Sequence, residues 1–191
     1  QDQAGLRLKA LGVIEGYPDG SLGLDRNITR AEMAVVLAEM SGMSNAARVL
    51  DGVPSAFSDV ASNAWYTGYI NLAQQQSWVS GYPDGTFRPN AQVSYAEAVT
   101  MMLNTLGYQG DRLPGTWPSN YLVKAAQLNI TSGLTFGRND AAIRGDVFLI
   151  ASRTLDKDMV RWNSDENDFL PTGKILLDEL DLTLVEDARI T

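Results

Sequence analysis

The sequence predicts a mainly helical protein in which three related segments each contribute one buried helix to a central bundle. Residues 16–20 read Gly-Tyr-Pro-Asp-Gly and recur as 81–85. The same spacing places residues 29–32 on 94–97 without a gap. Two matching blocks in one register indicate an internal repeat. Each copy then continues into a long apolar run, and a helix without a polar face is a buried helix.

A third, more divergent copy follows the first two. Trp65 and Tyr69 align with Trp117 and Tyr121, and further on residues 144–146 fall in the column of 30–32. We therefore divide the chain into four parts: a first repeat over 1–43 that lacks its N-terminal part, a linker and second repeat over 44–108, a degenerate third repeat over 109–155, and an acidic extension or the start of a further domain over 156–191.

Each complete repeat is expected to contain two helices and a turn-rich connection. The Tyr-Pro-Asp-Gly tetrapeptide is a turn sequence, because Pro presets φ, Asp bonds its own backbone and Gly tolerates positive φ. Thr29 with Glu32, and Ser94 with Glu97, have the spacing of a capping box, so a helix is expected to begin at each pair. The apolar runs that follow cover residues 33–38, 98–103 and 147–151.

The other helix of each repeat shows helical spacing of apolar residues over 69–73 and 121–126. The first copy has only the end of this helix, over 4–11, and a short helix is expected over 44–50. Beyond residue 155 the pattern stops. We expect an extended acidic connection over 156–173, and then a strand, because leucines alternate with polar residues over 180–184. A lone strand is unstable, so this tail either folds back on the bundle or opens another domain.

Composition excludes several functions. The chain has no cysteine and no histidine, which removes disulfides, Ser-His and Cys-His catalysis and the usual zinc sites. Fifteen basic and 23 acidic residues give a net charge of -8, which argues against a nucleic-acid partner. No stretch is apolar enough for membrane insertion. What survives is carboxylate, Lys, Tyr or Ser chemistry, or no catalysis, and we expect no enzyme activity, no cofactor and no bound metal.

These motifs resemble those of the S-layer homology domain family. The resemblance rests on Phe-Ser-Asp-Val at 57–60 followed by Trp65, on residues 81–90, and on the helix start at 29–32, and it covers about residues 4 to 155. It implies a pseudo-threefold prism of three repeats around a three-helix bundle. It also implies an extracellular location, in the cell wall or surface layer, and non-covalent attachment to secondary cell wall polysaccharide. In this family that polymer often carries pyruvate ketals on an amino sugar, N-acetylmannosamine.

The resemblance further implies that ligand lies in grooves between neighbouring repeats and that the arginine of the helix-start motif reaches the anionic sugar. A ketal carboxylate needs a bidentate donor, backbone amides near a turn, and a flat apolar surface for the ring. Arg30, the expected chief anion contact, and Arg144 can supply the donor. The turns at 16–20 and 81–85 can supply amides, and Trp65 or Trp117 the surface. The candidate ligand-binding residues are Gly16, Tyr17, Gly20, Arg30, Glu32, Trp65, Gly81, Tyr82, Gly85, Tyr95, Trp117 and Arg144.

The copies depart from the family pattern at several positions. Tyr95 stands where the second copy should have the motif arginine, so its groove is expected to bind weakly or not at all. The third copy loses the turn Asp, and Ile143 replaces the capping Thr, which leaves its groove in doubt despite Arg144. The first groove is expected to keep Arg30 and Glu32 but to lack its own Trp.

Structural explanations stand beside the functional ones. Arg30 could brace the fold by pairing with a carboxylate, Glu32 and Glu97 are explained as helix caps, and Trp65 and Trp117 could staple the repeats. Asp19 and Asp84 are expected to be turn residues, not calcium ligands. An alternative function is protein assembly, in which a module with degenerate glycan grooves self-associates in a surface layer. A carboxylate-dependent glycan hydrolase is a poorer fit, because the acids already serve as caps and turns.

Overall fold

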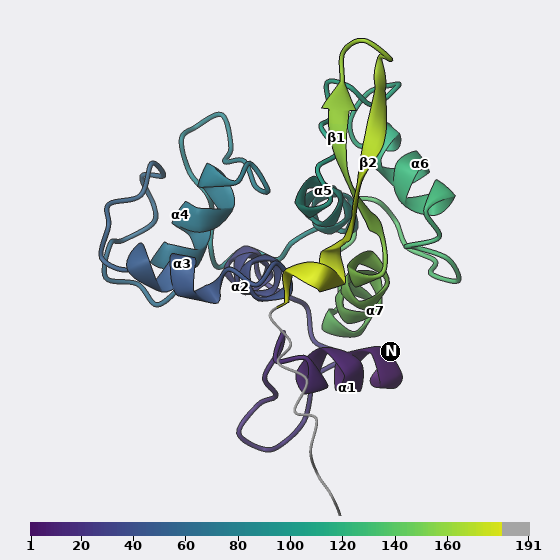
Figure 1. Cartoon of the computed structure of the whole chain (residues 1–191). Helices are drawn as coiled ribbons and strands as arrows, with labels where there is room; N and C mark the ends of the chain where they lie inside the picture. Colours follow the sequence, from purple (N-terminus) through teal and green to yellow (C-terminus); the bar gives the residue numbers. More distant parts are fainter. Residues whose placement is uncertain (181–191) are drawn as a thin grey trace, which may run out of the picture.

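The computed structural model describes residues 1–180 of the chain, and this part is mainly helical with one short two-stranded antiparallel sheet (Figure 1). The helices are α1 (Asp2–Ala10), α2 (Arg30–Met40), α3 (Ser44–Val49), α4 (Thr67–Gln75), α5 (Tyr95–Thr105), α6 (Ser119–Gln127) and α7 (Arg144–Leu155). Strands β1 (Asp158–Asn163) and β2 (Asp168–Ile175) and a 3-10 turn, η1 (Leu176–Glu179), follow. Each helix expected from the sequence is present, with ends shifted by a few residues.

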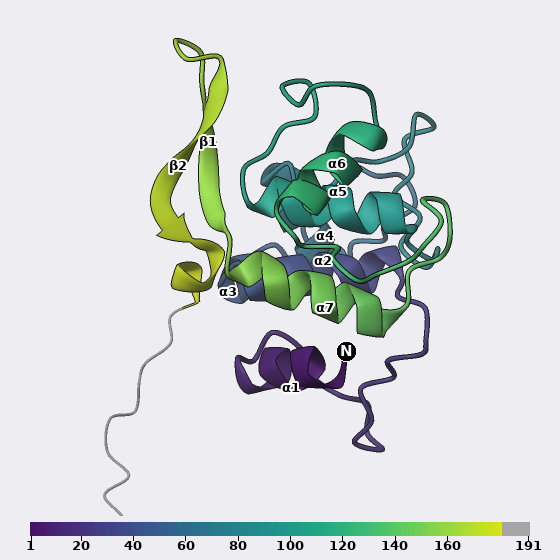
Figure 2. The same ribbon diagram turned by 90° about the vertical axis from the view of Figure 1, so that its right-hand side faces the viewer.

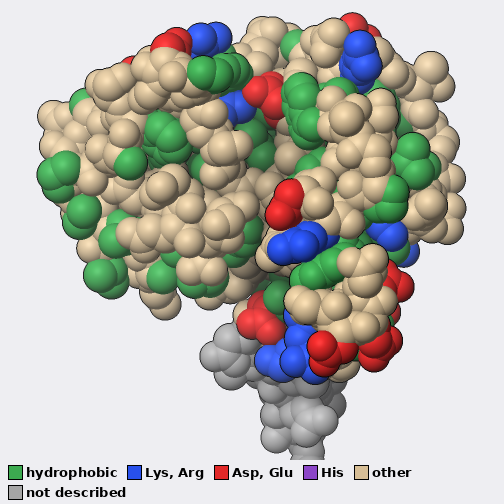
Figure 3. Space-filling view, turned by 90° about the horizontal axis from the view of Figure 1, so that it is seen from above, with side chains coloured by type: hydrophobic (Ala, Val, Ile, Leu, Met, Phe, Trp, Pro, Cys, Tyr) green, Lys and Arg blue, Asp and Glu red, His purple; other side chains and the backbone are tan. Residues whose placement is uncertain are grey.

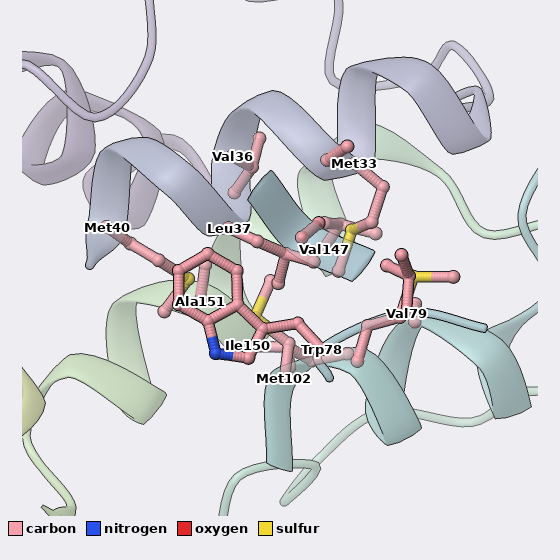
Figure 4. Packing of buried hydrophobic residues seen from close by; sticks show 14 of the residues in the cluster. Met33, Val36, Leu37, Met40, Trp78, Val79, Met102, Val147, Ile150 and Ala151 are labelled. Atoms are coloured by element: carbon pink, nitrogen blue, oxygen red, sulfur yellow. The ribbon is translucent and has the colours of Figure 1, made fainter. Parts of the chain in front are cut away.

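The three apolar helices α2, α5 and α7 lie side by side at the centre, with α5 in contact with both others (Figures 1 and 2). Their side chains meet in one core, where Leu37, Met102 and Ile150 are fully buried (Figure 4). The other helices pack outside, α1 on α7, α4 on α2 and α6 on α5. The prediction of a buried central helix from each repeat is confirmed.

The segments that precede the central helices are joined by backbone hydrogen bonds in a closed ring. The amide of Ile28 donates to the carbonyl of Ala142 (3.1 Å), Ala142 to Val93 (2.8 Å) and Val93 to Ile28 (3.0 Å). All three residues are fully buried, where an unpaired amide would be costly. Because every segment both donates and accepts, the three helix starts are held in one fixed arrangement.

The same cross-repeat bonding continues into the first turn of each central helix. The amides of Arg30, Tyr95 and Arg144 donate to the carbonyls of Ala91 (2.9 Å), Asp140 (3.0 Å) and Arg26 (2.8 Å). Each acceptor lies in the loop of another repeat. The side chain at the first helical position therefore emerges at a seam between repeats.

The helix starts follow the capping chemistry of the sequence. Both predicted capping boxes are present, with Glu32 and Glu97 accepting from the backbone amides of Thr29 (2.7 Å) and Ser94 (2.8 Å). Helix α7 has no side-chain cap, because Ile143 brings no hydroxyl to its N-cap position.

The C-terminal part differs from the extended connection expected over 156–173. Strands β1 and β2 form a hairpin with Trp162 opposite Phe169. Its aromatic pairing continues to Tyr108, and the amide of Val160 donates to the carbonyl of Leu106 (2.7 Å), so the hairpin is tied to the second repeat. Turn η1 packs on α2 and α7. The described part of the tail thus folds back on the helices. Of the strand predicted over 180–184, all residues after Leu180 lie outside the described part of the chain.

The surface shows no continuous basic face in the view of Figure 3. There the larger upper part presents mostly hydrophobic and uncharged groups, with a few charged side chains at its upper edge and centre, and charged side chains of both signs gather on the narrower part below it. None of the helices in residues 1–180 combines the length and apolar character that crossing a membrane requires.

Truncation of a side chain in the central core should lower the stability of the fold. We expect Leu37→Ala to lower the free energy of unfolding by about 2–5 kcal/mol, because it leaves a cavity where all three central helices meet. Val49→Ala, at a side chain that is 79% exposed, is the control and should change it by less than about 0.5 kcal/mol. Urea denaturation measures both. Equal stability of the two variants would contradict the shared core.

Candidate functional site

Arg30 is buried at the seam between the first and second repeats, with only 2% of its surface exposed. Its Nε donates to the carbonyl of Phe87 (2.7 Å), its Nη1 to Oε1 of Glu97 (2.7 Å) and its Nη2 to the carbonyl of Ser80 (3.0 Å). The guanidinium also lies over the rings of Tyr82 and Phe87. Arg30 therefore braces the loop of the second repeat, as the structural explanation of this residue expected.

Glu97 joins the cap of α5 to this seam. Its Oε2 accepts from the backbone of Ser94, while its Oε1 accepts from Arg30 and from the hydroxyl of Tyr82 (2.9 Å). Burial alone would raise the pKa of Glu97, but the Ser94 amide, the charge of Arg30 and the Tyr82 hydroxyl together hold the pKa below its ordinary value of 4.5. Burial, reinforced by the hydrogen bond to Glu97, raises the pKa of Tyr82.

A small hollow of about 130 Å³, the Arg30 groove, opens beside this pair. Trp117, from the segment that enters α6, forms one wall and is 55% exposed. Its Nε1 donates to the hydroxyl of Thr100 (3.0 Å). The other lining residues are Arg30, Trp78, Val79, Ser80, Gly81, Tyr82, Glu97, Met101 and Asn104.

Arg144 occupies the corresponding position between the third and first repeats. Its Nε donates to the carbonyl of Leu22 (3.2 Å) and its Nη1 to Oε1 of Glu32 (3.2 Å). The guanidinium lies over the rings of Tyr17 and Phe148, at 5.1 and 5.0 Å from their centroids. The two seams therefore use the same set of residue types: arginine, glutamate and the tyrosine of the turn.

The Arg144 groove is the larger of the two, with a volume of about 480 Å³. Trp65, from the segment that enters α4, lines it and is 62% exposed. The other lining residues are Gly12, Val13, Ile14, Glu15, Glu32, Val35, Val36, Glu39, Arg48, Tyr69, Arg144 and Phe148.

The third seam, between the second and third repeats, has Tyr95 in place of an arginine. The Tyr95 hydroxyl donates to Oδ2 of Asp146 (2.5 Å), and its ring stacks on Phe136 with centroids 4.4 Å apart. Burial, together with this hydrogen bond, raises the pKa of Tyr95 to about 12, so the group is neutral at pH 7. This seam keeps the packing of the other two and lacks their cation.

The pairing of arginine with glutamate differs from the expectation. Arg30 and Glu32 do not share a groove: Arg30 pairs with Glu97, and Glu32 with Arg144. The reason is the cross-repeat bonding at the helix starts, which directs each arginine toward the next repeat. Each groove thus combines the arginine of one repeat, the glutamate of a second and the Trp of a third.

This arrangement also corrects the expectation that the Arg30 groove lacks a tryptophan, since the third repeat supplies Trp117. Both Trp65 and Trp117 are largely exposed, so neither is a buried staple of the repeats.

The two glycine-rich turns position tyrosines. In the second turn the Tyr82 amide donates to Thr86 (2.8 Å) and the Gly85 amide to Tyr82 (3.0 Å); Tyr17 and Gly20 make the same bonds in the first. The amides of Tyr17, Gly20, Tyr82 and Gly85 are therefore already used within the turns. Gly20 and Gly85 have φ near +80°, and a Cβ on Gly16 or Gly81 would lie within 3.0 Å of neighbouring atoms.

Asp19 and Asp84 act as turn residues, as expected. Their Oδ1 atoms accept from the amides of Ser21 (2.9 Å) and Thr86 (3.0 Å). Hydrogen bonds from Thr86, followed by Arg88, lower the pKa of Asp84 to about 2. Within residues 1–180 no group of three acidic side chains is placed to hold a metal ion.

Several residues of the Arg144 groove were not predicted from the sequence. Arg48 lies on α3, and Glu39 and Tyr69 lie on α2 and α4. Arg48 and Glu39 lie outside the repeated motif, so no local pattern marks them, whereas Tyr69 aligns with Tyr121 in the repeat but was not assigned to a groove. They reach the groove because α3 and α4 pack together and α4 packs on α2.

Comparison with known proteins relates this chain to a protein family. The model of the S-layer homology domain matches residues 6–34 and 56–99. The chain is 40% identical over 154 residues to the middle cell wall protein of Brevibacillus brevis, covering 81% of this chain and 14% of that protein. It is 36% identical over 156 residues to a cell surface protein of Thermoanaerobacter kivui, covering 82% and 20%.

A third relative is the cellulosome-anchoring protein of Acetivibrio thermocellus, 35% identical over 104 residues, which cover 54% of this chain and 23% of that protein. The matched part is thus less than a quarter of the length of each of these three relatives.

The lowered pKa of Glu97 predicts a pH-dependent contribution to stability. Because the folded-state pKa lies below 4.5, this contribution is fully present above pH 4.5 and is lost as the pH falls through the folded value. We expect Glu97→Gln to lower the free energy of unfolding at pH 7 by about 1–3 kcal/mol. The difference from the parent protein should shrink below pH 4.5.

Urea denaturation over a pH series measures this difference. Glu166→Gln, in the exposed hairpin turn, is the matched control and should stay within about 0.5 kcal/mol of the parent at pH 7. A difference for Glu97→Gln that stays constant down to about pH 3 would contradict the assigned ionisation.

Proposed function

Because this chain belongs to the S-layer homology domain family, we propose that it anchors a larger extracellular protein to the bacterial cell wall by binding a wall polysaccharide non-covalently. Relatives that carry similar sequence are named as a cell wall protein, a cell surface protein and a cellulosome-anchoring protein, which supports this location and role.

The observation that carries the proposal is the recurrence of one residue set at two seams. Arg30, Glu97, Tyr82 and Trp117 at one seam correspond to Arg144, Glu32, Tyr17 and Trp65 at the other. In each set a largely exposed indole lines the same groove as an arginine that is held by a carboxylate. An exposed indole gives a flat apolar surface on which a sugar ring can stack, and the guanidinium gives a fork that matches a carboxylate.

We further propose that the ligand is an anionic glycan, with a pyruvylated amino sugar as the leading candidate. A pyruvate ketal carries a carboxylate on a sugar ring, which combines the two features that the grooves can recognise. Arginine is suited to this contact, because its guanidinium stays charged and offers paired N–H donors.

The proposed overall form is a pseudo-threefold prism. The closed ring of hydrogen bonds among Ile28, Val93 and Ala142 supports it, because each segment makes the same two bonds to its neighbours. The three seams then correspond to one another, and two of the three contain an arginine.

The grooves favour binding over catalysis. Both Glu32 and Glu97 accept a backbone amide at a helix start and an arginine N–H. Carboxylates committed in this way are poor general acids or bases, because proton transfer would break both the cap and the ion pair.

Co-sedimentation with purified cell wall sacculi tests the proposed function. We expect the protein to pellet with intact sacculi and to remain in the supernatant after acid extraction has removed the wall polysaccharide, because the ligand leaves with the extract. Adding the extract back as a soluble competitor should release protein from intact sacculi. Equal pelleting with intact and extracted sacculi would contradict it.

The assembly alternative makes a different prediction. A self-associating module would show concentration-dependent sedimentation in analytical ultracentrifugation without any saccharide. A wall-binding module should sediment as one species over the same concentrations.

A further inference from the structure

The two arginine grooves have the same residue types but differ in size. The Arg144 groove encloses about 480 Å³ and the Arg30 groove about 130 Å³. Small-molecule sites in proteins are usually about 300–1,000 Å³ in volume. The Arg144 groove lies within this range, and the Arg30 groove lies below it.

The arginines also differ in how many of their donors are already used. All three nitrogens of Arg30 donate to protein acceptors, with two of the bonds at 2.7 Å. Arg144 donates through Nε and Nη1 only, at 3.2 Å each, and within residues 1–180 no acceptor bonds its Nη2. Because a guanidinium has five N–H donors in a fixed fork, Arg144 keeps a nitrogen for a ligand.

A second cation lines the Arg144 groove. Arg48, on α3, is exposed and forms no ion pair with any residue that the structure describes. The Arg30 groove has no equivalent among its lining residues. Because Arg48 and Arg144 belong to different helices and border one cavity, a ligand that fills the cavity can meet both.

Three carboxylates share this groove and limit what can bind. Glu32 is held by Arg144 and the cap of α2, and Glu39 accepts from the hydroxyls of Ser44 and Tyr69. Glu15 is exposed. Carboxylates only accept hydrogen bonds, so they favour a partner with hydroxyl or amide donors over a dense polyanion.

We propose that the Arg144 groove, in place of the Arg30 groove, is the ligand-binding groove of this chain and that Arg48 is its second cationic contact. The occupant is an acidic glycan segment longer than one sugar, with one carboxylate at Arg144, a second negative group at Arg48 and its hydroxyls at the glutamates. The proposal rests on the proposed function and narrows it. Arg30 then serves the fold.

The two exposed tryptophans allow a matched test that leaves the buried arginines intact. We expect Trp65→Ala to weaken binding of the acid-released wall polysaccharide by about tenfold or more in calorimetry, because it removes the stacking surface of the Arg144 groove. Trp117→Ala makes the matched change at the Arg30 groove and should weaken binding by a smaller factor than Trp65→Ala does. Leu6→Ala, at a residue of α1 that is 61% exposed and lines neither groove, is the control and should change the dissociation constant less than about twofold. Thermal unfolding of both variants confirms that each is folded.

Arg48→Gln tests the second contact, with Arg161→Gln on the exposed hairpin strand as its control. Arg48→Gln should weaken binding by about three- to fivefold at low salt, the size expected for an exposed charge pair, and should make binding less sensitive to added salt. Arg161→Gln should bind like the parent.

The outcomes separate this inference from the proposed function. If the parent protein binds the polysaccharide and Trp117→Ala loses binding while Trp65→Ala does not, the assignment of the groove is wrong but the wall-binding function stands. If Arg48→Gln binds like the parent, Arg48 makes no contact. If the parent protein binds neither the sacculi nor the released polysaccharide, the proposed function is wrong.

Discussion

The closed ring of backbone hydrogen bonds among Ile28, Val93 and Ala142 is the constraint on which the other features depend. Each of these buried segments donates to one neighbour and accepts from the other. If one segment moved, it would break two hydrogen bonds and leave one buried polar group unsatisfied on each of its neighbours, at about 1–3 kcal/mol for each group. The three central helices therefore start at defined positions, and the residue at the first position of each, Arg30 or its counterpart, always faces a seam.

The ion pairs at two seams show how one arrangement can serve both folding and recognition. A guanidinium as buried as that of Arg30 needs a paired carboxylate, because its desolvation is otherwise too costly. Glu97 meets this need while it caps α5. The more completely the protein satisfies such an arginine, the fewer donors remain for a ligand. Arg144 makes fewer and longer hydrogen bonds than Arg30 and borders a wider groove. It therefore keeps more of its donors for a ligand.

The third seam shows what divergence between repeats preserves. Tyr95 keeps a buried side chain at the helix start, and its hydroxyl is paired with Asp146. The stacked ring of Phe136 fills the space beside it. Packing and hydrogen bonding are retained, whereas the positive charge is lost. Stability therefore constrains the shape of a seam more tightly than its charge.

Local chemistry in the sequence determined the repeats, the helices, the two capping boxes and the turns, because these depend on interactions between residues a few positions apart. It also marked Arg30, Arg144, Trp65 and Trp117 as members of a repeated pattern. Only the tertiary structure decided that each arginine pairs with the glutamate of another repeat, because the cross-repeat backbone bonds set that direction. It likewise decided the hairpin, the unequal volumes of the grooves and the place of Arg48, since these depend on contacts between segments distant in the chain, which no local pattern encodes.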